Sequence, residues 1–130
     1  MGSITKGLLV FLGIGRVDTD NDLRYMISKT VNLRAFQDEN GKMNLNLLDV
    51  KGEILVVSQF TLFADCRKGR RPSFIDAAPP DHAKKLYENY IRGLEERGLH
   101  VSSGIFQAIM EVSLVNDGPV TFLIDSSKLF

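Results

Sequence analysis

The stretch VNDGPVT, positions 115–121, separates two apolar runs near the end of the chain. Asparagine, aspartate and glycine in succession between strand-like runs are typical of a tight hairpin turn. The proline that follows has no backbone N–H to donate and is disfavoured inside a strand. The pattern predicts a hairpin built from residues 106–115 and 120–124, with a rigid exit from its turn.

A second stretch, SQFTL at positions 58–62, also puts small polar side chains inside a strand-like pattern. In a regular strand, Ser58 and Phe60 lie on one face. Gln59 and Thr61 then lie on the other face. All four can line one pocket only if the strand bulges or ends here, and the sequence leaves both possibilities open. Two such interruptions in one small domain indicate a functional site.

Between these two stretches and before them, the hydrophobic spacing predicts a mixed α/β (α+β) fold with two helices. The expected elements are a strand over 7–14, a helix that opens at 18–20 and runs to about 33, a turn at 38–41, a strand over 54–63, and a helix from about 79 to 98. No repeat or linker divides the chain, so we expect one domain over residues 1–130.

Composition excludes several classes of protein. The chain has 130 residues, 44% hydrophobic and 25% charged, which suits a globular domain. Its formal net charge is zero, so the whole surface is not expected to attract polyanions. Cys66 is the only cysteine, which rules out a disulfide framework and a thiolate metal site. The apolar run at 8–12 is too short to span a bilayer, so we expect no membrane partner.

The residues also argue against a calcium loop and against an active site built on histidine. The stretch DTDND at 18–22 opens like a calcium loop, but Leu23 and Lys29 replace the required glycine and glutamate. His82 and His100 are the only histidines, and we expect both to be solvated and away from the polar stretch. We therefore expect no metal, and a hydrolase built on this chain would have no obvious side-chain general base.

A basic run follows directly on the polar stretch. Such runs usually lie on solvated loops, but arginine forks also match phosphate oxygens. Its position favours phosphate binding, because the run directly follows the polar stretch. The run would then bind the backbone of a nucleic acid while the strand before it contacts the end of that molecule. The basic residues are Arg67, Lys68, Arg70 and Arg71.

Four segments together resemble the D-aminoacyl-tRNA deacylase family, also called D-tyrosyl-tRNA deacylase. They are GLLVFLG at 7–13, SQFTL at 58–62, KGRRPSF at 68–74 and NDGPVT at 116–121. The resemblance implies a mainly antiparallel β-sheet with a barrel-like core and two helices. It also implies a cytoplasmic homodimer that needs no cofactor, has a cross-subunit active site, and hydrolyses the ester between a D-amino acid and the 3′ end of aminoacyl-tRNA.

The resemblance also assigns roles to residues. Backbone amides near Gln59 and Phe60 would stabilise the oxyanion, and Thr61 would be a positioning hydroxyl or a nucleophile. The bond between Gly118 and Pro119 is cis in the family, where it enters the partner's site and excludes L-amino acids. The implied catalytic residues are Ser58, Gln59, Phe60 and Thr61. The implied pocket residues are Phe106, Met110, Asn116 and Thr121. The implied tRNA-binding residues are Arg67, Lys68, Arg70 and Arg71.

The chain departs from the family pattern in two places. Family members usually carry a further strand and hairpin arm, with a Gln-Arg pair, ahead of the segment equivalent to Gly2-Ser3-Ile4. We therefore expect an N-terminally truncated domain that is less stable and less active than a version with the arm. The second departure is Gln107, which stands where the family commonly has glycine.

Two other functions fit the same residues. One is a catalytically silent module that binds the tRNA end, with the basic run for phosphates and Phe60 or Phe63 for base stacking. The other is a plain dimerisation domain, which would show no salt-dependent affinity for RNA. The sequence leaves open which D-amino acids are accepted and whether glycyl-tRNA is a substrate.

Overall fold

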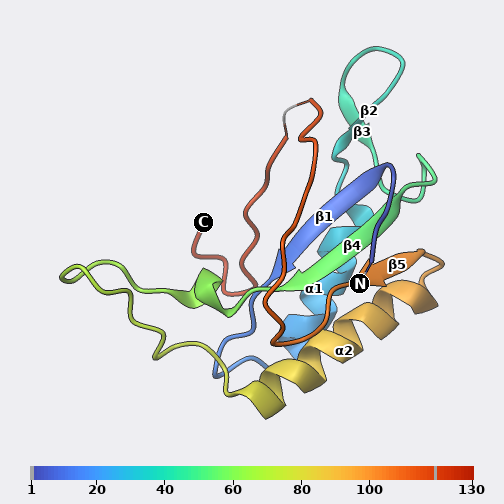
Figure 1. The fold of residues 1–130 in the computed structure, drawn as a ribbon. Helices are drawn as coiled ribbons and strands as arrows, with labels where there is room; N and C mark the ends of the chain where they lie inside the picture. The colour runs from blue at the N-terminus through green and yellow to red at the C-terminus, as the bar shows by residue number, and fades with distance from the viewer. Residues whose placement is uncertain (1, 119) are drawn as a thin grey trace.

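Two helices pack against a three-stranded parallel sheet (Figure 1). The structure is a computed structural model that describes residues 2–118 and 120–130. The sheet has the order β1-β4-β5, formed by β1 (Gly7–Leu12), β4 (Glu53–Ser58) and β5 (Val101–Ser103). β1 runs parallel to β4 along its whole length, and β5 runs parallel to the other edge of β4.

The connections explain why these strands are parallel. α1 (Asp20–Asn32) and the short hairpin of β2 (Phe36–Gln37) and β3 (Met43–Leu45) lie between β1 and β4. α2 (Pro80–Glu96) lies between β4 and β5. A crossover through a helix returns the chain to the same end of the sheet, which gives parallel pairing.

The expected fold class is therefore confirmed as mixed α/β with two helices, but one detail of it is wrong. A mainly antiparallel sheet was expected, whereas antiparallel strand pairing among the described residues is confined to β2 and β3. The barrel-like core is not confirmed, because the described strands form an open order with β1 and β5 at the edges. Within the described residues, no helix has the length and apolar character needed to cross a membrane.

Both helices lie where the sequence places them, and local signals explain their ends. The Thr19 N–H donates to Asp22 Oδ2 over 2.8 Å, which satisfies a free donor at the start of α1. α2 begins with Pro80, whose missing N–H costs nothing in the first turn. Past its end, Gly98 has φ 88°, a left-handed conformation that glycine adopts readily.

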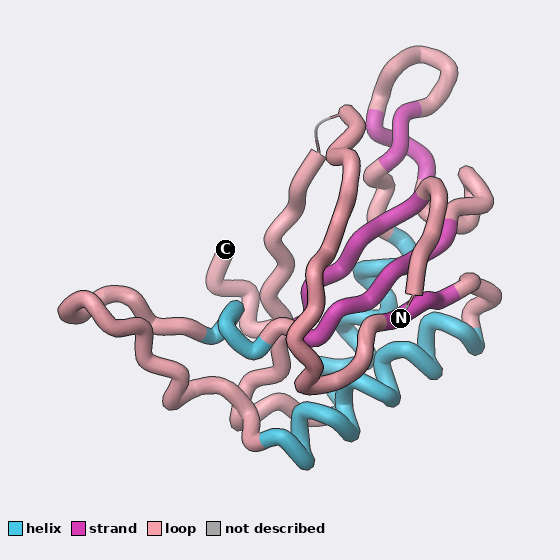
Figure 2. Tube along the Cα trace, viewed as in Figure 1, coloured by secondary structure: helices cyan, strands magenta, loops and turns pink. Residues whose placement is uncertain are grey.

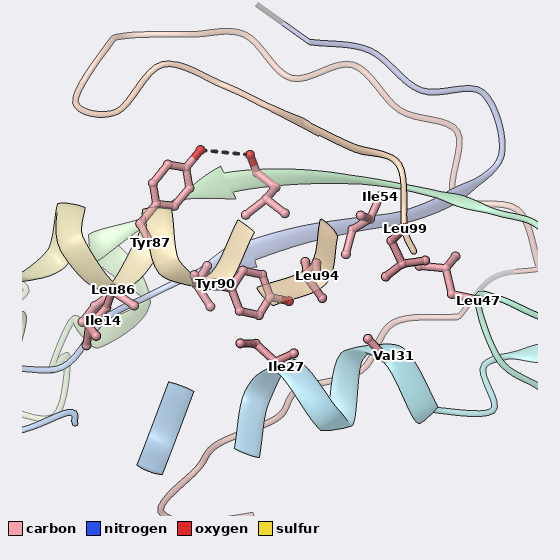
Figure 3. Packing of buried hydrophobic residues seen from close by; sticks show 12 residues of the cluster. Ile14, Ile27, Val31, Leu47, Ile54, Leu86, Tyr87, Tyr90, Leu94 and Leu99 are labelled. Carbon is pink, nitrogen blue, oxygen red and sulfur yellow. Dashed lines mark hydrogen bonds between the residues drawn. The ribbon is translucent and has the colours of Figure 1, made fainter. Parts of the chain in front are cut away.

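The core lies between the helices and one face of the sheet (Figure 3). Alternate residues of the central strand β4, Ile54 and Val56, are fully buried, as the two-residue period of a strand requires. Tyr90 of α2 is also fully buried, and its hydroxyl lies 2.7 Å from the Thr30 Oγ1 of α1. The remaining buried members of the cluster are Leu12, Ile14, Ile27, Val31, Leu47, Leu86, Tyr87, Leu94 and Leu99.

Two of the expected strands are shorter than the sequence suggested. The strand expected over 7–14 ends at Leu12, although Ile14 remains buried. The strand expected over 54–63 ends at Ser58 and continues into a single 3₁₀ turn, η1 (Phe60–Phe63). In both cases the apolar run extends beyond the backbone pairing, because burial alone does not require a strand.

The hairpin expected at 106–124 is present as a reversal of the chain but not as two strands. The chain runs out and back over this segment (Figure 2), yet no described residue after Ser103 is in a strand. No backbone hydrogen bond joins the two legs within the described residues, and a strand requires such a ladder. The turn itself is closed by Asn116 Nδ2, which donates to Thr121 Oγ1 over 3.2 Å. Pro119 lies outside the described residues.

Candidate functional site

The polar stretch lies where β4 ends. Ser58 is the last residue of this strand and pairs with Leu12 of β1. The Gln59 N–H donates to the Leu12 carbonyl over 2.8 Å, which continues the pairing by one bond. The chain then turns into η1 at Phe60. Of the two possibilities that the sequence left open, a bulge or a strand end, the structure shows the strand end.

Beyond the strand end, the side chains of Gln59 and Thr61 are in direct contact. Gln59 Nε2 donates a hydrogen bond to Thr61 Oγ1. Because Thr61 accepts this bond, the proton of its own hydroxyl remains available to donate to a ligand. Thr61 is exposed, so a ligand can reach that hydroxyl.

Of the two amides that were expected to stabilise an oxyanion, one is already engaged. The Gln59 N–H is bonded to Leu12, so it is not free to bind a second acceptor. The Phe60 N–H meets no acceptor within the part of the chain that the structure describes. One donor aimed at a developing oxyanion is often worth about 3 kcal/mol of transition-state stabilisation. The amide at the start of η1 is therefore the better candidate.

The basic run forms a loop with an ordered base, which we call the basic loop (residues 65–73). At its base, Asp65 and Ser73 exchange two backbone hydrogen bonds of 2.7 and 2.9 Å. At its tip, Gly69 has φ 66°, which permits the sharp turn. Figure 1 shows the loop, in green to yellow-green, extending away from the end of the sheet.

One of the four basic side chains, that of Arg67, is paired with a carboxylate of the same loop, although it remains 85% exposed. Arg67 binds the carboxylate of Asp65 with two guanidinium hydrogen bonds of 2.9 and 2.8 Å. These bonds, together with that from the Arg67 backbone N–H, hold the pKa of Asp65 at about 2. Lys68, Arg70 and Arg71 are exposed and take no part in the salt bridges found among the described residues. These three are the charges of the loop that have no salt-bridge partner among the described residues.

The predicted pocket residues lie in two separate places. Phe106 packs beside Tyr87 with ring centroids 5.7 Å apart, and Met110 lies against Gly104. Both segments are near the carboxyl end of β4, because the Tyr87 hydroxyl donates to the carbonyls of Val56 and Gly104.

The turn between Asn116 and Thr121 lies at the other end of the sheet from η1 (Figure 1). Gly118 in that turn has φ 131°, which only glycine adopts without strain. The structure therefore does not bring this turn to Thr61 within one chain. The Gly118–Pro119 bond lies outside the described residues.

Among the described residues, neither histidine forms a hydrogen bond or salt bridge with the polar stretch. The His100 Nε2 lies 3.3 Å from Glu53 Oε2, at the start of β4 and about 16 Å along the strand from Ser58. The expectation that both histidines are solvated is wrong for His82. Its Nε2 lies 2.8 Å from the Asp18 carbonyl, because α2 packs against the loop that precedes α1.

A hollow of about 640 Å³ lies beside η1. Its wall includes Phe63 and Asp18, but none of the residues from Ser58 to Thr61 among those described. Burial raises the pKa of Asp18, while the Gly15 N–H, which donates to Asp18 Oδ2 over 2.7 Å, opposes that shift. The carboxylate thus fixes the loop after β1 and has no partner that suggests catalysis.

Two residues of this region were not singled out from the sequence. Asp65 lies at the base of the basic loop. An aspartate four residues before Gly69 is a turn signal, so the sequence could have indicated this residue. Phe74 lies against Phe60 with ring centroids 5.1 Å apart. No local sequence pattern predicts that contact, because it joins residues on the two legs of a loop.

Known proteins resemble this chain along its whole length. A family model described as D-Tyr-tRNA(Tyr) deacylase matches residues 1–125. A D-aminoacyl-tRNA deacylase of Thermosipho africanus is 59% identical over 130 residues, which is 100% of this chain and 87% of that protein. The protein of the same name from Clostridioides difficile is 57% identical with the same coverage. A solved structure titled "c-Myc DNA Unwinding Element Binding Protein" superposes with a TM-score of 0.83 and 40% identity, covering 90% of this chain and 80% of that one.

Proposed function

The chain belongs to the D-Tyr-tRNA(Tyr) deacylase family, and from that premise we propose that it hydrolyses the ester joining a D-amino acid to the 3′ end of tRNA. The family expected from the four sequence segments is thereby confirmed. The products are the free D-amino acid and the tRNA. In our proposal the reaction removes D-amino acids before they reach translation, so we expect the enzyme to act in the cytoplasm.

At the level of residues, the end of β4 at Ser58 supports this proposal. It places the Gln59 amide group on the hydroxyl of Thr61 and leaves the Phe60 N–H without an acceptor among the described residues. In our proposal the Phe60 N–H binds the oxygen of the ester carbonyl as water attacks. The Thr61 hydroxyl, oriented by Gln59, positions the substrate.

The reaction can proceed without a histidine near the ester. The leaving group is a ribose hydroxyl, and a neighbouring ribose hydroxyl can assist the attack on the carbonyl. Stabilising the developing negative charge is then the main task left to the protein. This mechanism does not need His82 or His100, whose rings contact the Asp18 carbonyl and the Glu53 carboxylate instead.

Selection against L-amino acids is assigned to the backbone at Gly118 and Pro119 in a homodimer. Within one chain the turn that holds Gly118 lies at the far end of the sheet from η1 (Figure 1). A second copy is therefore needed to bring such a turn to Thr61. A wall made of backbone discriminates at the Cα of the amino acid, so it accepts different side chains of the same hand.

Binding of tRNA is assigned to the basic loop. Lys68, Arg70 and Arg71 are exposed and free of salt bridges among the described residues, so they can replace counterions on the RNA phosphates. Arg67 was expected to share this role. Its bonds to Asp65 make it a support for the loop, which reduces its expected share of the RNA contact.

The test is hydrolysis of D-Tyr-tRNA and L-Tyr-tRNA by the wild-type chain and by two Thr61 variants. We expect the D ester to be cleaved and the L ester to persist. Thr61→Ala should lower the maximal rate with little change in tRNA affinity, while Thr61→Ser, which keeps the hydroxyl, should stay close to wild type. Equal rates on the two enantiomers would refute the selection mechanism. An unchanged maximal rate in Thr61→Ala would refute the assignment of Thr61.

The alternative function is a module that binds the tRNA end without turnover. One observation favours it, since the solved structure with 40% identity is of a protein named for DNA binding. Such a module would retain charged tRNA and release no amino acid during the same assay.

A further inference from the structure

A serine closes the basic loop directly behind two of its arginines. The stretch RRPSF at positions 70–74 places Arg70 three residues and Arg71 two residues before Ser73. Protein kinases select their acceptors partly by the charges at fixed distances from the acceptor. Two arginines at these positions are the pattern that arginine-directed serine kinases select.

The acceptor is accessible in the folded chain. The Ser73 side chain is exposed, and the Ser73 bonds that the structure shows among the described residues are the two backbone bonds to Asp65. Residues 66–72 belong to neither a helix nor a strand (Figure 2). Pro72 also disfavours helical backbone at Arg71, the residue before it, so the segment ahead of the serine is biased towards an extended form. A kinase can therefore bind this segment without unfolding a regular element.

Ser73 borders a hollow whose other walls are charged. The hollow has a volume of about 460 Å³ and is lined by Asp65, Arg67, Lys68 and Ser73. A guanidinium has five N–H donors, and the Asp65 carboxylate takes two of those of Arg67, so the others remain to bind an anion. Lys68 adds three donors and forms no salt bridge among the described residues. A phosphate on Ser73 would thus meet two cations of its own loop.

One charge in the hollow opposes such a phosphate. The pKa of Asp65 is held at about 2, mainly by the bonds from Arg67, so this carboxylate is ionised at neutral pH. The loop nevertheless carries four basic side chains against this single acid. The excess of positive charge favours a bound dianion.

We propose that Ser73 is a phosphorylation site for an arginine-directed serine kinase, and that its phosphate weakens the binding of tRNA to the basic loop. The Ser73 oxygen bonds to the γ-phosphorus of a nucleoside triphosphate, and the bond from that phosphorus to the β-phosphate oxygen breaks. The nucleoside diphosphate leaves, and the serine proton passes to a base of the kinase. The inference rests on the proposed function, because tRNA binding by this loop is what the phosphate regulates.

The size of the effect follows from the charge that is added. A phosphoserine carries about 1.5 to 2 negative charges at pH 7 and has three acceptor oxygens. Pairing with the cations of the loop then removes about two contacts to RNA phosphates. The logarithmic salt slope of tRNA binding should become shallower by about 1.5, and the affinity should fall about tenfold at about 0.15 M salt.

The first experiment measures the modification itself. The folded chain is incubated with ATP and the catalytic subunit of cyclic-AMP-dependent protein kinase, an arginine-directed kinase, and the phosphate is located by mass spectrometry of peptides. We expect phosphate on Ser73 of the wild type and none in the same peptide of Ser73→Ala. Ser73→Thr should accept phosphate again, and the double variant Arg70→Gln, Arg71→Gln should accept much less. Circular dichroism before incubation shows that each acceptor is presented by folded protein.

The second experiment measures the consequence for tRNA. Binding is measured at several salt concentrations for the wild type and for Ser73→Ala, each before and after treatment with the kinase. Treatment should lower the wild-type affinity about tenfold and flatten its salt slope. Ser73→Ala should bind tRNA equally before and after treatment. The protein isolated with phosphatase inhibitors from the cells that make it should carry the phosphate on the same peptide.

Three results would overturn the inference. The first is a wild-type chain that takes up no phosphate on Ser73 from the kinase. The second is native protein without phosphate at this position. The third is a phosphorylated chain whose tRNA affinity and salt slope equal those of the untreated chain.

Hydrolysis of D-Tyr-tRNA by the untreated chain separates this inference from the proposed function. Phosphate on Ser73 that weakens tRNA binding, in a chain that leaves D-Tyr-tRNA charged, would overturn the hydrolysis and support the modification site. Normal hydrolysis by a chain that takes up no phosphate on Ser73 would overturn the modification site alone.

Discussion

The hydrogen bond between Tyr90 and Thr30 gives this protein a measurable dependence of stability on alkaline pH. The Thr30 hydroxyl donates to the Met26 carbonyl over 2.7 Å, so the proton between Thr30 and Tyr90 comes from the tyrosine. Burial raises the pKa of Tyr90 to about 12, and the bond to Thr30 opposes that shift. The ordinary pKa of a tyrosine is about 10.

The sign of the effect follows from which state holds the proton more tightly. The folded pKa is the higher one, so the contribution of Tyr90 is fully present below about pH 10 and is lost as the pH rises towards about 12. Over that range the free energy of unfolding should fall by about 1.4 kcal/mol for each pH unit from this one group. Tyr87, whose pKa is also raised by burial, adds a slope of the same sign.

The variant Tyr90→Phe isolates the contribution of Tyr90. Below about pH 9 it should be less stable than wild type by about 1 kcal/mol, because one hydrogen bond is lost while Thr30 keeps its bond to Met26. Above about pH 10 the difference should shrink and then reverse, because the phenylalanine has no proton to lose. Urea unfolding followed by circular dichroism, at steps from about pH 8 to about pH 11.5, measures this crossing.

Thr30→Ser is the matched control, because it keeps the hydroxyl and removes only a buried methyl group. It should be less stable by about 1 kcal/mol at every pH and keep the wild-type slope. Parallel curves for wild type and Tyr90→Phe up to about pH 11.5 would refute the argument. They would mean that Tyr90 ionises in the folded protein as readily as in the unfolded chain.

Three further predictions concern other parts of the fold. Gln107 has φ 65°, so Gln107→Gly should raise the free energy of unfolding by about 1 kcal/mol, and a thermal melt that shows no gain would contradict this. A Cβ on Gly93 of α2 would overlap the Cδ1 of Ile27, so Gly93→Ala should cost about 1–2 kcal/mol by urea unfolding despite its better helix propensity. Adding Ile27→Val, which removes that atom, should recover part of the loss, and no recovery would point to a different cause. Asp65→Ala removes the carboxylate that accepts three hydrogen bonds from Arg67, so trypsin should cleave within the basic loop faster than in wild type, while sites outside the loop are cut at unchanged rates. Equal cleavage rates would mean that the basic loop is ordered without the aspartate.

The parts of the fold that follow from local sequence were predictable, and those that depend on distant partners were not. Both helices were placed correctly, because their apolar spacing and end signals lie within each segment. The pairing of β1 with β4 was not, because a strand pattern does not say which strand lies beside it or in which direction. The segment 106–124 shows the same limit, since its strand pattern lacks a backbone ladder among the described residues.

In the candidate site, too, local features were predictable from the sequence and long-range contacts were not. The polar residues at 58–61 were found because they interrupt an apolar strand. Whether all four of these residues could line one pocket was undecidable, because that depends on whether the strand bulges or ends here. The end of β4 is fixed by its last bond to Leu12. Gln107 was noticed only through the family resemblance. The structure supplies the physical reason, a positive φ that glycine adopts without strain.

The central place of β4 has a consequence for the order in which the protein assembles. Both β1 and β5 pair only with β4 among the described strands, and β1 is synthesised before all of α1 and the β2–β3 hairpin. A nascent chain therefore carries an apolar β1 with no partner until residues 53–58 have left the ribosome. Long-range pairing of this kind slows folding, because the closure entropy is lost before the contacts form. Substitutions that weaken β4 should thus lengthen the time during which newly made chains are open to aggregation and to chaperones.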